Sequence, residues 1–288
     1  MKAHTMRRRF QQVDVFSPVP FAGNPLAVVL DAEGLSTEQM QQFSRWTNLS
    51  ETTFVLPPTT PEADYRVRIF TLARELPFAG HPTLGSCHAW LAAGGVPRDG
   101  GRIVQECGAG LVPIRRGEHG LAFAAPPLIR TGPVDEPLVQ NLAEVLGIGR
   151  REIVDAQWAD NGPGWVAVLL KGADAVLAVE PDFSRYTGEG SLDIGLVGPY
   201  PPGSECAWEV RALFSDEQGA MREDPVTGSL NASLGQWLLA SGSATAPYVA
   251  SQGTRLGRRG RPRIEQDADG TVWVGGAAIT CIQGEVDL

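Results

Sequence analysis

The pattern of hydrophobic and polar positions predicts a chain of short strands interrupted by a few well-marked helices. Hydrophobic residues alternate with polar ones over 13–16 and 65–70, whereas they form a continuous run over 26–30. The first pattern is typical of half-buried strands and the second of fully buried ones. The full set of predicted strands is 13–16, 26–30, 52–56, 65–70, 103–105, 111–116, 120–124, 165–170 and 209–213, with short strands finishing the chain.

Four stretches carry helical signals. Ser36 is a good N-cap for a helix through about Trp46, and Gly147 closes a second helix over 138–146. The remaining two helices follow Pro82 and Pro225, and the later one is predicted to span 225–240.

Two segments show no such periodicity. Residues 1–11 are predicted to be a loose tail, and residues 186–205, rich in Gly, Pro and Ser, to be irregular.

A short motif occurs twice. His-Pro-Thr-Leu-Gly-Ser at 81–86 is echoed by Asp-Pro-Val-Thr-Gly-Ser at 224–229, 143 positions later, which is half of the 288-residue chain within one residue. The same offset relates Val-Arg at 67–68 to Val-Arg at 210–211. Matches that keep their order and nearly constant spacing indicate an internal duplication.

The duplication predicts two homologous halves. We place them at 12–130 and 150–285, with a linker at about 127–152 and with ends of the chain free to cross over between the halves. Each half contains many strands and one well-marked helix. The predicted fold class is therefore α+β, with a barrel-like sheet wrapped around a central helix in each half, rather than alternating βαβ units.

Each copy of the motif has the features of a helix start. In the second copy Asp224 suits the N-cap position and Pro225 the first helical position. A helix start offers free backbone N–H groups and the positive end of the helix dipole, so two such starts could hold one small anion. The alternative is that both are ordinary capped helices of the core.

Composition excludes several classes of function. The chain is 43% hydrophobic and 20% charged with a net charge of −9, which argues against a nucleic-acid partner or an anionic membrane surface. No apolar run approaches the length of a membrane span, and the chain is expected to be cytoplasmic. We interpret the basic runs 7–9 and 255–263 as a solvated tail and a solvated loop.

Metal and cofactor signals are missing. The 4 cysteines, at 87, 107, 206 and 281, have no C-x-x-C spacing, so free thiols in a reducing compartment are expected. The 4 histidines form no metal motif, and no G-x-G-x-x-G opens a helix after a strand. We therefore predict no metal and no bound cofactor.

Four motifs together resemble one known family. They are Phe-Ala-Gly-Asn-Pro-Leu-Ala-Val-Val at 21–29, Asn-Leu-Ser-Glu-Thr-Thr-Phe-Val at 48–55, Pro-Phe-Ala-Gly-His-Pro-Thr-Leu-Gly-Ser at 77–86 and Glu-Asp-Pro-Val-Thr-Gly-Ser at 223–229. In this order they resemble the PhzF, or phenazine-biosynthesis-like, family. The resemblance implies the diaminopimelate-epimerase fold, in which two pseudo-symmetric domains enclose the active site in a cleft between them.

The resemblance also implies roles for residues of the first half. The glutamate of the Asn-x-Ser-Glu-Thr motif falls on Glu51 and would be the general acid/base, because a partly buried carboxylate can take and return a proton. Gly80 and His81 would contact the substrate, with His81 also assisting the proton transfer, and Asn24 would bind substrate. The simpler alternatives are a solvated Glu51 and an N-cap His81.

In the second half the Asp-Pro-x-Thr-Gly-Ser motif falls on residues 224–229. Asp224 would hold a polar substituent of the substrate, and Ser229 with the Gly228 backbone would hold its carboxylate. The simpler alternative for Asp224 is a plain N-cap, which is compatible with the first role.

The function that follows is a cofactor-independent isomerase that moves a proton within a small carboxylated, cyclic or unsaturated amino-acid-like substrate. In the family's best-known activity the substrate is a dihydro-hydroxyanthranilate. Related epimerases use two cysteines, but no cysteine stands at either motif, and Cys87 is predicted to be core. Two alternatives stay open: an epimerase or racemase with His81 or Asp224 as second base, and a non-catalytic protein that binds small acids. The resemblance also implies a homodimer.

Overall fold

The computed structural model describes residues 6–188, 190–215 and 221–288. The chain divides into two compact units, which are described separately. The first unit comprises Met1–Ala124 and Gly275–Leu288, and the second comprises Ala125–Val274. The stretch expected to be a linker, about 127–152, contains a strand and a helix of the second unit.

Strands of the first unit form a strongly curved mixed sheet. β18 pairs with β1, β1 with β2 and β3 with β4 in antiparallel fashion, whereas β2–β3 and β4–β6 are parallel. β6, β7 and β8 complete the sheet as an antiparallel meander. The strands are β1 (Arg7–Val15), β2 (Asn24–Val29), β3 (Glu51–Leu56), β4 (Tyr65–Thr71), β5 (Glu75–Leu76), β6 (Arg102–Cys107), β7 (Gly110–Gly117), β8 (Gly120–Ala124) and β18 (Ala278–Asp287).

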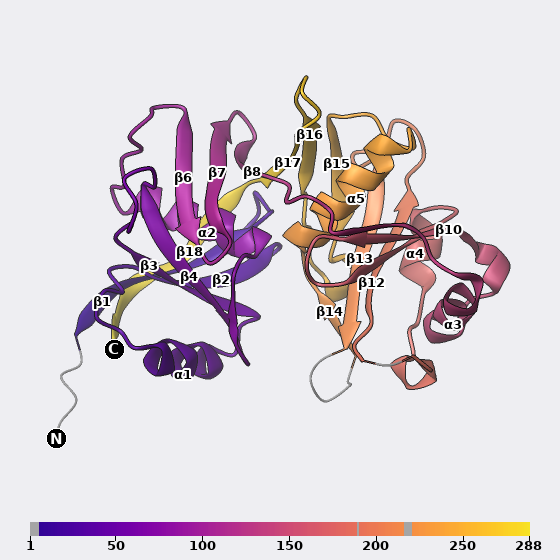
Figure 1. Ribbon diagram of the computed structural model, residues 1–288, viewed down its shortest axis with the longest axis horizontal. Helices are drawn as coiled ribbons and strands as arrows, with labels where there is room; N and C mark the ends of the chain where they lie inside the picture. The colour runs from indigo at the N-terminus through magenta and orange to yellow at the C-terminus, as the bar shows by residue number, and fades with distance from the viewer. Residues whose placement is uncertain (1–5, 189, 216–220) are drawn as a thin grey trace. The chain divides into compact units, whose positions relative to one another are not determined.

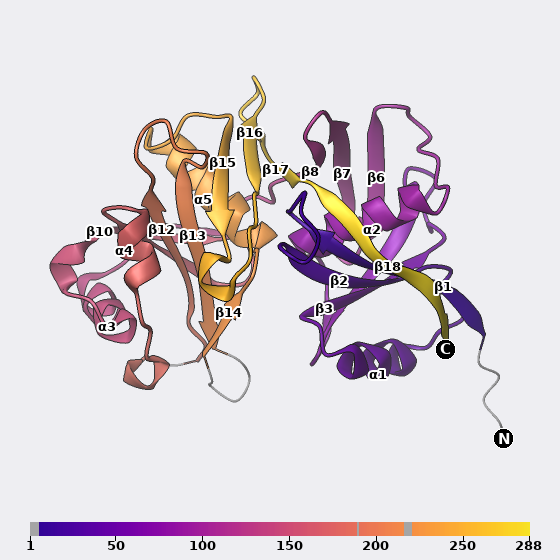
Figure 2. The same ribbon diagram turned by 180° about the vertical axis from the view of Figure 1, so that it is seen from behind.

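Helix α2 (Gly80–Ala92) lies inside this sheet and packs against β1, β2, β3, β8 and β18 (Figures 1 and 2). Small residues allow the close approach. A side chain at Gly85 would begin 2.5 Å from a methyl carbon of Leu26, so a larger residue there would require the Leu26 side chain to move. The predicted core role of Cys87 is confirmed, because its side chain is completely buried on this helix.

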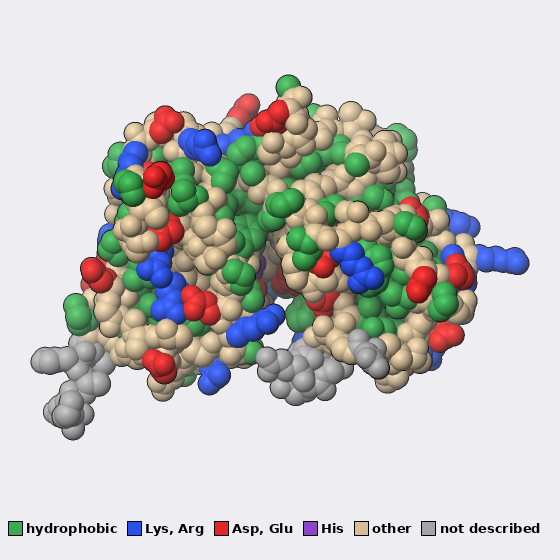
Figure 3. Space-filling model, viewed as in Figure 1, with side chains coloured by type: hydrophobic (Ala, Val, Ile, Leu, Met, Phe, Trp, Pro, Cys, Tyr) green, Lys and Arg blue, Asp and Glu red, His purple; other side chains and the backbone are tan. Residues whose placement is uncertain are grey.

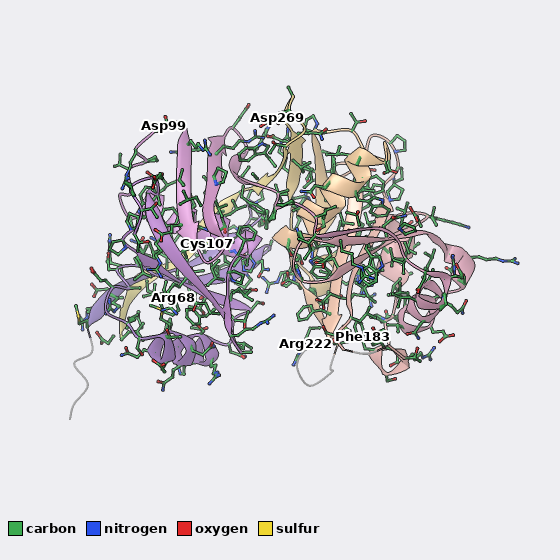
Figure 4. The ribbon with its side chains drawn as sticks, viewed as in Figure 1. Arg68, Asp99, Cys107, Phe183, Arg222 and Asp269 are labelled. Carbon is green, nitrogen blue, oxygen red and sulfur yellow. The ribbon has the colours of Figure 1, made fainter. Side chains whose placement is uncertain are left out.

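Helix α1 (Thr37–Thr47) covers the outer face of the same sheet. Ser36 caps it as predicted, since its hydroxyl accepts from the Gln39 N–H and the Gln39 side chain accepts from the Ser36 N–H. Arg68 of β4 donates to the Thr37 hydroxyl at 2.9 Å and so ties the helix start to the sheet (Figure 4). β2 and β3 are therefore covered on both faces, which explains why they read as continuous buried runs.

Strands of the second unit surround α5 in a comparable way. β9–β10, β10–β11, β12–β13 and β13–β14 are antiparallel, whereas β11–β12 and β13–β15 are parallel. β16 extends the sheet beyond β15. The elements are β9 (Arg130–Pro133), α3 (Glu136–Leu146), η1 (Arg150–Glu152), β10 (Ile153–Asp160), β11 (Trp165–Leu170), α4 (Ala173–Ala178), η2 (Phe183–Arg185), β12 (Asp193–Pro199), β13 (Trp208–Ser215), β14 (Met221–Asp224), α5 (Gly228–Ala240), β15 (Tyr248–Gln252), η3 (Thr254–Leu256), β16 (Arg263–Gln266) and β17 (Val272–Gly276), whose last two residues belong to the first unit.

A second hydrophobic core fills the space on the side of this sheet away from α5. Leu142 and Leu146 of α3 and Val176 of α4 pack there with residues of β10, β11 and β12. As predicted, Gly147 ends α3 in a left-handed conformation, with φ of 67°.

Two predictions about irregular segments are wrong. Residues 7–11, expected to belong to a loose tail, form most of β1, because they pair with the C-terminal strand β18 (Figure 2). Residues 193–199, expected to be irregular, form β12, which is held between β11 and β13. Residues 1–5 and 189, which fell in the same two predictions, lie outside the described residues.

Surface charges of both signs are interspersed on the face seen in Figure 3. Several of the basic residues expected to be solvated make ion pairs, including Arg9 with Asp31 at 2.7 Å and Arg259 with Glu205 at 3.2 Å. None of the helices in the described parts of the chain combines the length and apolarity needed to cross a membrane.

A buried ion pair joins β13 to β14. The Arg211 guanidinium donates to both carboxylate oxygens of Glu223, at 3.1 and 2.9 Å, and also to the backbone oxygens of Val176 and Val179 at the end of α4. The two side chains are only 3% and 7% exposed, so neither charge has water as an alternative partner.

We expect Arg211→Leu to lower the free energy of unfolding by about 3–5 kcal/mol, because the Glu223 carboxylate is left buried without its cation. The control is Arg150→Leu, which removes a similar pair with Glu136 at the surface; it should cost far less, because both charges are already solvated. Denaturant unfolding of both variants measures the difference, and equal losses would show that burial does not decide the cost.

Candidate active site

Glu51 and Asn24 stand at the same edge of the first unit's sheet. Each is the first residue of its strand, Glu51 of β3 and Asn24 of β2, and these strands are parallel neighbours. The turn before Asn24 is fixed by Gly23, whose N–H donates to the Asp14 carboxylate at 2.8 Å. A side chain at Gly23 would begin 2.2 Å from the Val15 carbonyl oxygen, so glycine is required for this turn.

His81 projects from the start of α2 into the same place. Its Nδ1 lies 3.4 Å from the Asn24 side-chain nitrogen, and its Nε2 lies 3.6 Å from a carboxylate oxygen of Glu51. His81 and Asn24 are buried, whereas the Glu51 side chain keeps 18% of its surface exposed. Three of the predicted residues are thus brought together, with the carboxylate the most accessible to solvent.

The Asn24 amide lies against Nδ1 of His81. With the amide nitrogen facing the ring, Nδ1 accepts, and the neutral ring carries its hydrogen on Nε2, facing Glu51. Burial lowers the pKa of His81 from 6.5 to about 3. The ring is therefore neutral at pH 7 and presents an N–H donor beside the carboxylate.

The two central helices begin differently from α1 and α3. α1 and α3 have side-chain caps, Ser36 and Asp135, and an acidic residue in their first turn. α2 and α5 have neither, and both begin at a buried glycine, Gly80 or Gly228. Their first N–H groups are not covered by a capping side chain, which is the arrangement suited to an anionic ligand.

The predicted start of α5 is wrong. Asp224 is not its N-cap and Pro225 is not its first residue; Thr227 is the N-cap and Gly228 the first residue. Asp224 is instead the last residue of β14, in register with Ala212 of β13, and this extended pairing delays the helix. His81 is likewise not an N-cap, since Ala79 takes that position.

The offset between the two central helices differs from the offset between the two motifs. The central helices, each 13 residues long, begin at Gly80 and Gly228, which are 148 positions apart rather than 143. His81 therefore corresponds in position to Ser229, because each is the second residue of its helix, and not to Asp224.

Ser229 is held by two side chains of the β10–β11 region. Its hydroxyl accepts from the Trp165 indole N–H at 3.1 Å, and its backbone oxygen accepts from the Asn161 side chain at 3.0 Å. The Ser229 hydroxyl is thus oriented with its own hydrogen free to be donated.

Gln252 organises the turn between β14 and α5. Its side chain accepts from the Thr227 N–H and donates to the Thr227 hydroxyl and to the Asp224 backbone oxygen. The Thr227 hydroxyl in turn donates to the Asp224 carboxylate at 2.6 Å. Asp224, Gly228 and Ser229 are therefore grouped around the start of α5.

Sequence reasoning missed Gln252, Trp165 and Asn161. Gln252 is completely buried at the end of a strand, where its amide needs partners, but no local sequence pattern marks its burial or its contact with Thr227. In the parts of the chain that the structure describes, no group of three or more His, Cys, Asp and Glu side chains could hold a metal ion.

The sequence of this chain matches a known protein family. The family model described as phenazine biosynthesis-like protein, PhzC-PhzF, matches residues 13–284. The chain belongs to this family.

Individual PhzF-family relatives cover most of the chain. It is 35% identical to antisense-enhancing sequence 1 of Schizosaccharomyces pombe, over 96% of the chain and 97% of the relative. It is 34% identical to the trans-2,3-dihydro-3-hydroxyanthranilate isomerase of Pseudomonas fluorescens, over 85% of the chain and 86% of the relative. A PhzF-family crystal structure from Enterococcus faecalis superposes with a TM-score of 0.78 at 25% identity, covering 98% of this chain and all of that one.

The similar structures show the fold of this chain, and the named relatives show its enzyme class. Solved racemases and epimerases below 25% identity share only the architecture, which is the predicted α+β, diaminopimelate-epimerase-like fold. Several curated relatives are named isomerases, among them one of Pasteurella multocida at 32% identity and the Pseudomonas fluorescens enzyme. This chain is an isomerase, as predicted.

The low pKa of His81 predicts how stability depends on pH. As pH falls from 7 to 5, the unfolded chain protonates its histidine near pH 6.5, while the folded chain does not until about pH 3. Wild-type protein should therefore lose about 2 kcal/mol more stability over this interval than His81→Gln does. Urea unfolding at both pH values measures this, with His119→Gln, at the surface, as the control. Equal losses in wild type and His81→Gln would mean that His81 is protonated within the fold.

Proposed function

We propose that the chain is a cofactor-independent isomerase that moves a proton between two carbon atoms of a small, cyclic or unsaturated, amino-acid-like carboxylate. The observation that carries the proposal is the Glu51 carboxylate 3.6 Å from the Nε2–H of a buried, neutral His81. Of the groups around the starts of β2, β3 and α2, Glu51 is the one with acid/base chemistry and solvent access. The name of the Pseudomonas relative supports the reaction class.

In this reaction Glu51 removes a proton from one carbon and returns it to another. The electrons of the broken C–H bond form a new double bond, and those of the old double bond take up the returned proton. The product is an isomer, so no redox or group-transfer partner is needed. A single accessible carboxylate suits a transfer along one face of the substrate.

His81 assists without changing its own charge. The low pKa keeps the ring neutral, so its Nε2–H can donate to a polar group of the substrate or to the Glu51 carboxylate. Asn24 keeps this tautomer by occupying Nδ1. The Gly80 N–H, at the start of α2, is a further donor to the same substrate.

The start of α5 binds the carboxylate in this proposal. The Gly228 N–H and the Ser229 hydroxyl are the donors, and Trp165 orients the hydroxyl. Asp224, held by Thr227, accepts from a polar substituent. The uncapped first turn supports this assignment, because it leaves N–H groups for an anion.

Glu51→Gln should lower kcat by at least ~10²-fold, because the amide keeps the shape but cannot ionise. Substrate binding should change little. Turnover of trans-2,3-dihydro-3-hydroxyanthranilate, the first candidate substrate, measures the loss, with the exposed Glu62→Gln as the control. Near-normal turnover in Glu51→Gln together with an inactive Asp224→Asn would reverse the two assigned roles.

Ser229→Ala should show the opposite balance. Loss of one hydrogen bond to a charged group should weaken carboxylate binding by about 1–3 kcal/mol and leave kcat nearly intact. Ser233→Ala, one turn further along α5 and buried, is the control and should bind normally. A KM unchanged by Ser229→Ala would remove this residue from the binding site.

Solvent deuterium uptake separates this function from its competitors. Uptake with a shifted double bond indicates the isomerase, uptake with inverted stereochemistry an epimerase, and binding without uptake a non-catalytic protein. The homodimer stays a prediction, which light scattering of the purified chain checks.

A further inference from the structure

Asp193 lies on the inner face of the second unit's sheet. It is the first residue of β12, and Gly195, two positions later, faces α5 so closely that a side chain there would begin 2.3 Å from Leu230. Side chains alternate along a strand, so Asp193 points to the same face as Gly195. Its carboxylate is therefore on the face that packs against α5, whose third residue is Leu230.

The neighbours of Asp193 belong to the proposed carboxylate site. Asp193 is in register with Trp165 of the parallel strand β11, so the two side chains lie side by side on one face. Trp165 donates to the Ser229 hydroxyl at 3.1 Å. Through this contact Asp193 stands next to the residue that is proposed to hold the substrate's carboxylate.

The acceptors of this region are only partly satisfied by donors. The Asp160 carboxylate is fixed by the N–H groups of Gly162 and Gly164, both at 2.7 Å. The side-chain oxygen of Asn161 is buried and has no partner within residues 6–188, 190–215 and 221–288. Across the same ranges no group donates a hydrogen bond to the Asp193 carboxylate, whereas its backbone is paired with β11 and β13.

The charge at this position is not balanced by a cation. Burial, and next the Asp160 carboxylate, raise the pKa of Asp193 to about 6. An ionised Asp193 is therefore costly in the free protein, and a positively charged group would relieve both causes at once. An ammonium group provides both the charge and the missing donors.

We propose that Asp193, with Asp160 behind it, binds the ammonium group of the substrate and thereby selects amino acids over other carboxylates. This inference rests on the proposed function, because it takes the start of α5 as the carboxylate anchor. The two sites together complement a zwitterion, with its negative end at the helix start and its positive end at Asp193. Asp193 is thus a specificity residue, and the proton transfer itself stays with Glu51.

A matched pair of ligands tests the assignment. 2-Aminocyclohexane-1-carboxylate and cyclohexanecarboxylate differ only in the amino group, and calorimetry at pH 7.5 gives the affinity of each. We expect Asp193→Asn to weaken binding of the amino acid by about tenfold or more and to leave the deamino acid within about twofold. Asp174→Asn removes an equal charge from the exposed first turn of α4 and should change neither.

Three results overturn the inference. The first two are that Asp193→Asn weakens binding of both acids equally, or that it changes the binding of neither. The third is that the wild-type protein shows no preference for the amino acid, or binds neither acid. An unchanged affinity for both acids would be expected if Asp193 were protonated and donated to the carboxylate, because the asparagine amide can also donate. Asp193→Ser is the second variant, and circular dichroism confirms folding of each.

Ser229→Ala separates this inference from the proposed function. If Ser229→Ala weakens both acids while Asp193→Asn affects neither or both alike, the carboxylate anchor stands and the ammonium site fails. If Ser229→Ala leaves both acids unchanged, Ser229 is not the carboxylate anchor and the ammonium site loses its basis, whereas the proton transfer by Glu51 is judged separately by the turnover of Glu51→Gln.

Discussion

A helix enclosed by a sheet must satisfy the N–H groups of its first turn without help from bulk water. In this protein the constraint falls on α2 and α5, each wrapped by strands of its own unit. Ordinary caps are not used at either helix, although the outer helices α1 and α3 have them. The positions next to the central helix starts hold buried polar side chains instead, and the proposed chemistry depends on these two places.

Burial also decides what the groups at these starts can do. Enclosure keeps His81 neutral, so it is a donor of fixed tautomer rather than a cation. The same physical cause raises the pKa of Asp193, so in both groups burial favours the neutral form. Low polarity thus removes the charge from His81 at pH 7 and makes the charge of Asp193 costly until a counter-charge is bound.

Sequence reasoning succeeded where the signals were local. The capping box at Ser36, the closing Gly147 and the alternating strands were all found, because each depends on neighbouring residues. Glu51, His81 and Asn24 were found through motifs, and the structure brings them together. Capping and turn motifs span only a few neighbouring residues, so they can be recognised in the sequence.

Predictions failed where distant pairing decides the conformation. Asp224-Pro225 has the form of a helix start, but pairing with β13 keeps Asp224 extended. Residues 193–199 became a strand because they lie between two others, and no local pattern marks them. Gln252, 25 positions after Thr227, was invisible for the same reason.

The pairing of β1 with β18 has a consequence for synthesis. The backbone of Met6 hydrogen-bonds to that of Leu288, so the first unit is closed by a segment that leaves the ribosome only after the whole second unit. The second unit, by contrast, is one continuous stretch and is complete once residue 274 has emerged. Domains fold as their chains become available. The order of folding is therefore the reverse of the order in the sequence: the second unit can form while the first still waits with β1 as an open edge, exposed to wrong pairing until β18 arrives.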